Sequence, residues 1–286
     1  MASKNMEGRI CLITGATSGI GLVTARELAK QGATVIVHGR SKEKCEQVVK
    51  DVKTISGNSN VEFMLADLSK LSDVRNLAEE FKNRYNRLHV LINNAGAVYM
   101  RREETADGFE MTFGVNHISH FLLTNLLLDI LKASAPSRII NVSSRAHERG
   151  KIDFNDLQAR KRYFAMTAYG QSKLANVLFT YELARRLEGT NVSVNALHPG
   201  FVASGFGMNN NLMKLLRPIV KLIAISPEEG AKTTIYLATS PEAEGVSGKY
   251  FVERKAVKSS PASYDKEAAE RLWKISEELT GIRWKE

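Results

Sequence analysis

Short apolar runs of strand length alternate along this chain with longer stretches that show a helical repeat of apolar and polar positions. The apolar runs span residues 10–14, 34–38, 61–65, 88–92, 138–142, 192–197 and 249–252. The helical patterns span residues 20–31, 41–55, 70–85, 108–133 and 164–187. Buried strands that alternate with helices are typical of a parallel sheet covered on both faces. The pattern therefore predicts an α/β fold with one doubly wound, mainly parallel sheet of seven strands.

No linker rich in Pro, Gly or Ser, no low-complexity segment and no internal repeat divides the chain, so we expect residues 1–286 to form a single domain. One stretch, Asn209–Ile225, departs from the alternation of strands and helices. It is predicted to be a helical insertion broken near Pro218 and placed close to the open end of the sheet. Residues near 201–226 are accordingly interpreted as a lid over the substrate.

Composition and charge exclude several classes of function. Hydrophobic residues make up 43% of the chain and charged residues 25%, as in an ordinary globular protein. The formal charge of +9 raises the question of nucleic acid, but basic and acidic residues are interleaved and no basic run or nucleic-acid motif is present. We expect a solvated basic surface that binds no nucleic acid, with part of the charge serving an anionic cofactor.

The two cysteines, Cys11 and Cys45, stand in no CxxC or Cys/His cluster, which predicts neither a metal site nor a disulfide framework. The short polar N-terminus is interpreted as neither a signal peptide nor a membrane span, and no run of eighteen apolar residues occurs. These features favour the cytoplasm or another reducing intracellular compartment.

A glycine-rich turn follows the first apolar run and opens directly into a helical pattern. Its glycines, Gly15, Gly19 and Gly21, have the spacing TGxxxGxG. Such glycines allow a tight turn and a close approach to a pyrophosphate, and the helix N-terminus supplies free N–H groups with a partial positive charge. The turn predicts a dinucleotide-binding site; the alternative is a tight connection that binds no ligand.

The end of the second apolar run bears on the choice of cofactor. An acidic residue commonly recognises the ribose 2′-hydroxyl there, but this chain has Arg40 and Ser41 instead. Arg40 can clamp a 2′-phosphate and Ser41 can add a hydrogen bond, which favours NADP(H) over NAD(H). The alternative is that Arg40 is a solvated surface arginine. Asp67, after the third run, either accepts from the adenine amino group or caps the following helix.

Tyr169 and Lys173 are four residues apart in a helical pattern and therefore share one face. An ammonium and an oxidised nicotinamide both favour the phenolate, so such a tyrosine can act as an acid or a base. The spacing alone is common in helices. The context is more specific, because Ser143 and Ser144 end the fifth apolar run at the edge where open α/β sheets bind ligands. Asn116 is a polar residue in an apolar helix, where a core hydrogen bond is the alternative role.

Together these motifs resemble the short-chain dehydrogenase/reductase superfamily over essentially the whole chain. The matching segments are TGATSGIG at 14–21, NNAG at 93–96, NVSS at 141–144, YGQSK at 169–173 and HPG at 198–200. The resemblance implies a Rossmann-type domain with strand order 3-2-1-4-5-6-7. It implies Tyr169 as the acid/base, Lys173 as modulator of its pKa and ribose ligand, and Ser144 as the residue that orients the substrate oxygen. Asn116 would support a water chain that leads from Lys173.

The same resemblance implies further contacts with the cofactor, beyond the glycines, Arg40, Ser41, Asp67, Tyr169 and Lys173. These contacts are Thr17, Ser18, Ile20, Leu68, Asn94, Ala95, Gly96, Pro199, Gly200, Val202 and Ser204, the last replacing a threonine of the family. Two segments, SRAHERGKIDFNDLQARKRY from residue 144 and RLWKISEELTG near the C-terminus, are similar to the retinol dehydrogenase-like branch.

The expected substrate is a lipophilic carbonyl compound or alcohol. Twenty-four residues separate Ser144 from Tyr169, and apolar side chains of this segment and of the lid can form an apolar mouth. These side chains are Phe154, Leu157, Tyr163, Phe164, Met166, Phe201, Phe206, Met208 and those of residues 212–225. The alternative is that most of them only pack the lid.

Three expectations about partners remain. Lys214, Arg217 and Lys221 flank apolar residues, so the 212–225 stretch is a candidate for contact with a membrane surface. The resemblance implies a homodimer or tetramer that uses the helices at 108–133 and 164–187. A non-catalytic NADPH-binding sensor or scaffold is the rival function, which the Asn-Ser-Tyr-Lys set disfavours because a binder needs no positioned phenol and ammonium.

Overall fold

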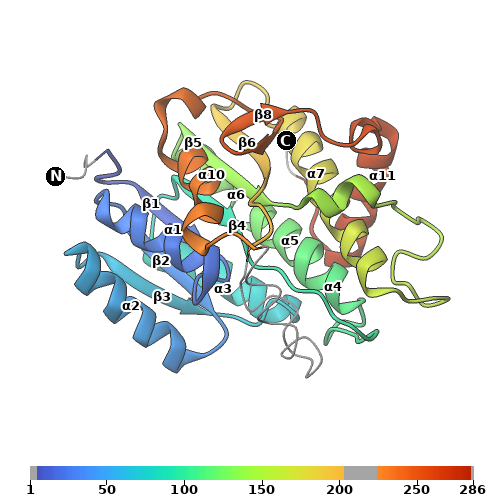
Figure 1. The fold of residues 1–286 in the computed structure, drawn as a ribbon, viewed down its shortest axis with the longest axis horizontal. Helices are drawn as coiled ribbons and strands as arrows, with labels where there is room; N and C mark the ends of the chain where they lie inside the picture. The colour runs from blue at the N-terminus through green and yellow to red at the C-terminus, as the bar shows by residue number, and fades with distance from the viewer. Residues whose placement is uncertain (1–4, 203–223, 285–286) are drawn as a thin grey trace.

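The computed structural model describes residues 5–202 and 224–284. One eight-stranded sheet runs through the molecule in the order β3-β2-β1-β4-β5-β6-β7-β8 (Figure 1). All neighbouring strands are parallel except β7 and β8, which are antiparallel. The strands are β1 (Ile10–Ile13), β2 (Thr34–Gly39), β3 (Val61–Leu65), β4 (Val90–Asn93), β5 (Ser137–Val142), β6 (Val192–His198), β7 (Lys249–Val252) and β8 (Lys255–Val257).

The seven predicted strands and their order are confirmed, and β8 is an eighth that the sequence did not predict. β8 has three residues, all exposed, and follows β7 after a two-residue turn in which Glu253 and Arg254 have positive φ. A solvated edge strand needs no apolar run, and for that reason hydrophobic periodicity does not reveal it.

Helices cover both faces of the sheet, as predicted. On one face lie α1 (Gly19–Lys30), α2 (Lys42–Ser56) and α10 (Pro227–Thr239), packed on the core cluster that includes β1 and β2. On the other lie α3 (Leu71–Arg84), α4 (Met111–Phe113), a π-helix (Gly114–Ile118), α5 (Ser119–Leu126), α6 (Leu128–Ala133) and α7 (Ala165–Arg186). Beside α7 lies α11 (Lys266–Thr280), at the right of Figure 1.

The helix predicted at 108–133 is therefore not one regular helix. It begins at Met111, passes through the π-helical turn and breaks at Leu127, whose ψ of 5° leaves the helical region. The π-helical turn carries Asn116, and such turns frequently occur at functional sites.

The predicted lid falls mostly outside the described residues, as do the candidate membrane-contact residues Lys214, Arg217 and Lys221. Its two ends are described. Val202 and Ile225 form an isolated parallel bridge, and the N–H of Ile225 donates to the carbonyl of Phe201 at 2.8 Å. The two ends of the predicted lid thus lie next to each other, shortly after the end of β6.

Candidate active site

The turn after β1 has the geometry of an anion-binding site. Gly15 and Gly19 adopt positive φ of 63° and 55°, which favours glycine. Ser18 is the N-cap of the twelve-residue helix α1, but its side chain makes no capping hydrogen bond, and the first helical turn contains no acidic residue. The first N–H groups of α1 are thus left for another acceptor.

The glycines also allow neighbouring segments of the protein to approach more closely than a side chain would permit. A Cβ on Gly15 would lie 2.9 Å from Cα of Ala95, and one on Gly21 would lie 2.6 Å from the Gly15 carbonyl oxygen. A Cβ on Gly39, at the end of β2, would meet Thr17 at 2.6 Å. The segments that follow β1, β2 and β4 therefore lie close together around the turn. A glycine turn at the N-terminus of a helix fits the pyrophosphate of a dinucleotide.

The segment after β4 braces this turn through Thr14. The Thr14 hydroxyl accepts hydrogen bonds from the N–H groups of Asn94 and Ala95 at 2.9 and 3.0 Å. The Asn94 side chain donates to the carbonyls of Thr14 and Gly15 at 2.8 and 3.2 Å. Asn94 and Ala95 thus support the turn as well as being predicted cofactor contacts, whereas Thr14 was not among the predicted site residues.

A buried histidine that the sequence analysis missed links this turn to Asn116. The Nε2 atom of His120 lies 3.0 Å from the Thr14 hydroxyl, and its Nδ1 lies 3.2 Å from the Asn116 carbonyl oxygen. Burial lowers the pKa of His120 to about 3, so the ring is neutral at pH 7. Since a carbonyl only accepts, Nδ1 carries the proton and Nε2 accepts from Thr14. The spacing of Asn116 and His120, one helical turn apart, was the available signal.

At the adenine end of the site, Arg40 is exposed at the end of β2, and Ser41 caps α2 by accepting from the N–H of Lys44 at 3.3 Å. Asp67 accepts from the N–H and hydroxyl of Ser69 at 3.0 and 2.8 Å, so it stabilises the turn before α3 rather than capping the helix itself. Burial opposes ionisation of Asp67, but the Ser69 hydrogen bonds and the Arg40 charge lower its pKa overall.

Of the other predicted cofactor contacts, Leu68 has its side chain in the core, 3% exposed. Ile20 lies beside Gly230 of α10, where an added Cβ would meet it at 3.3 Å. Gly200, after Pro199, has a φ of 90° and faces Ile225, whose side chain would clash with an added Cβ. Gly96 follows Ala95 in the same segment, whereas Ser204, Phe206 and Met208 lie outside the described residues.

The fold brings Tyr169, Lys173 and Ser144 together where β5 meets α7. A hydrogen bond joins the side chains of Ser144 and Tyr169, and Nζ of Lys173 lies 5.6 Å from the centre of the Tyr169 ring. Lys173 is 3% exposed, and Nζ donates to the Val142 carbonyl at 2.9 Å. Burial lowers the pKa of Lys173 to about 8.

Burial also raises the pKa of Tyr169 to about 12, while the hydrogen bond with Ser144 opposes that shift. In the protein alone, desolvation therefore dominates over any stabilisation of the phenolate. The lowered Tyr169 pKa expected from the sequence would therefore need a further positive charge, such as that of an oxidised nicotinamide.

The two adjacent serines have different surroundings, which spacing alone did not distinguish. The Ser143 hydroxyl is buried and donates to the backbone carbonyl of Lys173 at 2.7 Å. The Ser144 hydroxyl faces Tyr169 and accepts from the N–H of Ala146 at 3.2 Å. Ser143 thus fastens β5 to α7, and Ser144 lies beside the phenol.

Asn116 supports two segments of the site through its side chain. Its Oδ1 accepts from the N–H of Ala97 at 2.8 Å, and its Nδ2 lies 2.9 Å from both the Ala97 carbonyl and the Ser172 hydroxyl. The side chain is fully used in these contacts, while the backbone carbonyl meets His120. Asn116 therefore makes the core hydrogen bonds of the alternative role and also lies within the predicted site.

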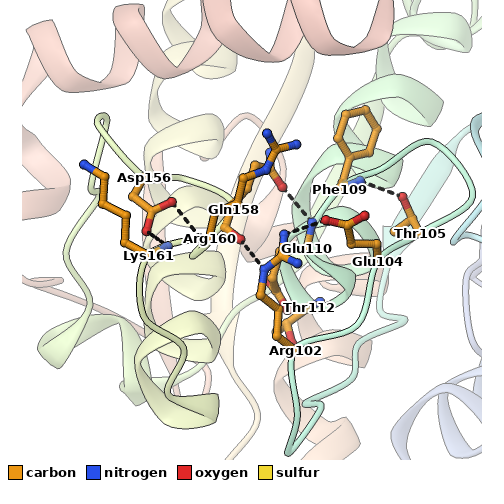
Figure 2. A network of polar contacts seen from close by, with 10 residues as sticks. All are labelled: Arg102, Glu104, Thr105, Phe109, Glu110, Thr112, Asp156, Gln158, Arg160 and Lys161. Atoms are coloured by element: carbon orange, nitrogen blue, oxygen red, sulfur yellow. Dashed lines mark hydrogen bonds and ion pairs between the residues drawn. The ribbon is translucent and has the colours of Figure 1, made fainter.

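A polar network fastens the segment before α7 to the segment before α4 (Figure 2). The Gln158 side-chain oxygen accepts from the N–H of Glu110 at 2.6 Å, and its backbone carbonyl accepts from Arg102 at 3.0 Å. The buried Glu110 carboxylate caps α4 by accepting from the N–H groups of Thr112 and Phe113, each at 2.8 Å. Outside the figure, the Tyr163 hydroxyl donates to the carbonyl of Tyr99 at 2.6 Å.

The side chains of the predicted apolar mouth fall into two groups by burial. Leu157 is buried and Phe154 packs on the same cluster, so these two belong to the core. Phe164, Met166 and Phe201 are 53%, 65% and 59% exposed and flank the start of α7 and the end of β6. The packing alternative therefore applies to Leu157 and Phe154, while an apolar mouth formed by the exposed side chains stays a prediction.

Within residues 5–202 and 224–284, no group of three His, Cys, Asp or Glu side chains is placed to hold a metal ion, and both cysteines are buried as free thiols. None of the described helices is long and apolar enough to cross a membrane.

Comparison with known proteins identifies the family. The model of the short chain dehydrogenase family matches residues 9–214, more than half of the chain. The chain is a short-chain dehydrogenase/reductase. As a member of this family, the chain is an oxidoreductase that acts on CH–OH groups and uses NAD(H) or NADP(H). The glycine turn and the uncapped N-terminus of α1 suit the binding of such a dinucleotide.

Individual relatives place it in the retinol dehydrogenase-like branch. It is 47% identical to retinol dehydrogenase 12 of Mus musculus, over 97% of this chain and 88% of that protein. It is 48% identical to human retinol dehydrogenase 13, over 98% and 87%. A crystal structure of an uncharacterised protein from Mycobacterium paratuberculosis has a TM-score of 0.81 at 37% identity, covering 98% of this chain and 96% of that chain. The RhlG/NADP complex of Pseudomonas aeruginosa has a TM-score of 0.70 at 27% identity, covering 88% and 96%.

Proposed function

We propose that this chain interconverts a lipophilic aldehyde or ketone and its alcohol, using NADP(H), with Tyr169 as the acid/base. The observation that carries the proposal is the cluster of Tyr169, Ser144 and Lys173, which lies at the carboxyl edge of the sheet beside the phosphate turn. A protein that only senses NADPH has no use for a half-buried phenol and a buried ammonium at this position.

A bound nicotinamide would supply or accept the hydride, and Ser144, Tyr169 and Lys173 would position the substrate oxygen and transfer the proton. The Ser144 hydroxyl donates to the substrate oxygen and sets its position next to the phenol. With its pKa at about 12, Tyr169 is protonated at pH 7, which is the form that donates a proton to a carbonyl oxygen during reduction. During oxidation the phenolate must form, and the charges of Lys173 and the oxidised nicotinamide stabilise it.

Substitution of Tyr169 by Phe tests this role. We expect turnover to fall by about 10²-fold or more, because the general acid is lost, with NADPH binding unchanged. Binding is measured by the quenching of intrinsic fluorescence and turnover by NADPH absorbance with a panel of carbonyl compounds. Wild-type-like turnover in the Phe variant would remove Tyr169 from the mechanism.

The preference for NADP(H) over NAD(H) rests on Arg40. Arg40 is exposed directly after β2, and its charge helps to lower the pKa of Asp67. The Asp67 carboxylate accepts a hydrogen bond from the N–H of Ser69. An exposed guanidinium at this point can form a bidentate pair with a 2′-phosphate. The substitution Arg40→Asp should weaken NADPH binding and spare NADH binding. An unchanged ratio of the two affinities would refute the assignment.

The proposed substrates are lipophilic, and retinoids are the first to test, since the relatives carry the name retinol dehydrogenase. Support within the chain comes from the exposed Phe164 and Met166 at the start of α7 and the exposed Phe201 after β6. A panel that runs from small polar carbonyls to long-chain and ring aldehydes should show kcat/KM rising with apolar size. Equal efficiency across the panel would contradict a lipophilic substrate.

A further inference from the structure

The C-terminal segment 265–284 covers the helices that the family resemblance assigns to subunit pairing. It consists of α11 and the residues that follow it, and it lies along α7 and along the segment 111–133 (Figure 1). The contact is intramolecular, because a single chain makes it.

Its packing is that of a protein core. Trp273 is 2% exposed, and its ring centre lies 5.0 Å from that of Phe121 in α5 and 5.7 Å from that of Phe179 in α7. Ala269 and Leu272 join a core cluster that includes Phe113, Leu174 and Leu178. Buried aromatic side chains contribute most of the energy of such contacts, so this segment is firmly seated.

Polar contacts fix the segment along its whole length. The Ser276 hydroxyl lies 3.1 Å from Nε2 of His117, the neighbour of Asn116 in the π-helical turn. Arg186, at the end of α7, places its guanidinium 4.2 Å from the centre of the Trp273 ring and 5.5 Å from that of Trp284. Near the end of the segment, Arg75 of α3 donates to the Thr280 carbonyl.

The middle of α7 and most of α5 retain no exposed surface for a second subunit. Every residue from Gly170 to Leu183 in α7 is buried within the single chain, as is every residue from Ser119 to Thr124 in α5. A stable interface needs about 800 Å² of accessible surface on each partner, and fully buried faces cannot supply it.

The open edge of the sheet is covered in a similar way. β8 pairs with β7, so the backbone of β7 is not available to another sheet. β8 itself has only three residues, begins with Lys255 and is followed by Lys258, and short charged edge strands resist pairing with other chains.

We propose that segment 265–284 takes the place of a partner subunit on α5 and α7, so that one chain supports its own catalytic helix and acts as a monomer. The dimer or tetramer expected from the resemblance would require this face. The segment 265–284 thereby supports the site itself, because α7 carries Tyr169 and Lys173 and the π-helical turn carries Asn116.

The first test uses the full-length wild-type chain and requires no turnover. Light scattering should give a mass near 31.7 kDa at every concentration examined, and hydrogen exchange of the α5 and α7 amides should not change on dilution. A dimer whose α5 and α7 amides lose protection when it dissociates would overturn the proposal.

The second test unseats the segment and compares it with a matched control on the same helix. In Trp273→Glu the buried ring is replaced by a charge, and we expect the α7 amides to exchange about tenfold faster or more through local opening. Lys274→Glu alters the exposed neighbour and should leave exchange unchanged. Unaltered protection of α7 in Trp273→Glu would refute the supporting role, and Trp273→Leu gives a milder version if the first variant does not fold.

Discussion

Replacing Lys173 by Met should stabilise the protein at neutral pH while abolishing its proposed activity. Lys173 is buried at 3% exposure, and burial lowers its pKa from 10.5 to about 8. A shift of this size corresponds to about 3 kcal/mol that the folded state loses by keeping the ammonium charged. Methionine has a similar length and no charge, so it removes that cost with little change in packing.

The hydrogen bond from Nζ to the Val142 carbonyl opposes this gain. Its loss leaves a buried acceptor unpaired, which costs about 1–3 kcal/mol. The expected net effect at pH 7 is therefore a gain of about 0–2 kcal/mol in the free energy of unfolding, the difference between the two effects.

The pH dependence has a definite sign. Between the folded pKa of about 8 and the unfolded value of 10.5, the unfolded wild-type chain binds one proton more than the folded chain, so wild-type stability rises with pH across this window. Below pH 8 the folded wild-type chain carries the full cost of keeping the buried Lys173 ammonium charged. The advantage of Lys173→Met should thus shrink above pH 8 and reverse by about pH 10.5, where only the lost hydrogen bond remains.

Urea unfolding of the cofactor-free protein at several pH values measures the effect. Lys50→Met is the matched control, because Lys50 is an exposed lysine on α2 and its replacement should change stability by at most about 0.5 kcal/mol. A Lys173→Met variant less stable than wild type at pH 7, or a difference that does not vary with pH, would show that burial does not penalise the Lys173 charge.

Two further predictions concern hydroxyl groups of the site. Thr14→Val removes the acceptor of the Asn94 and Ala95 N–H groups, and we expect thermal unfolding to show a loss of about 1–3 kcal/mol together with weaker NADPH binding; unchanged cofactor affinity would contradict a role for Thr14 in holding the turn. Ser144→Ala should lower kcat strongly, with a loss of stability limited to that of its hydrogen bond with the N–H of Ala146. Ser143→Ala should lower stability without a comparable loss of kcat, because the Lys173 carbonyl loses its buried donor. If Ser143→Ala lowered kcat and Ser144→Ala did not, the roles assigned to the two serines would be reversed.

The sequence predicted those parts of the fold that depend on local pattern. Apolar runs located β1 to β7, and glycine spacing located the phosphate turn before α1. It also placed Tyr169 and Lys173 one helical turn apart in α7. All of these rest on the period of a strand or helix, or on the special conformations of glycine, which a single sequence displays directly.

Contacts between distant segments could not be predicted in this way. Nothing in the pair Ser143-Ser144 shows that one hydroxyl faces a backbone carbonyl and the other a phenol, because this depends on how β5 lies against α7. The bridge from Thr14 through His120 to Asn116 joins the first strand to a helix in the middle of the chain. The helix α11 was not among the predicted helices, and periodicity does not show which face of the molecule the apolar side of a helix covers.

The burial of Lys173 and the covering of α7 by segment 265–284 are parts of one arrangement. A lysine is held charged in a low-dielectric interior only if the surrounding elements resist the rearrangement that would expose it to water. In α7 that resistance comes from the sheet on one side, through the Val142 carbonyl, and from Trp273 against Phe179 on the other. Unseating Trp273 should consequently relax the environment of Lys173 and move its pKa back from about 8 toward 10.5, so that the pH-dependent part of the stability shrinks in Trp273→Leu and persists in Lys274→Glu. A Trp273→Leu chain with the wild-type pH dependence would show that the sheet alone keeps Lys173 buried.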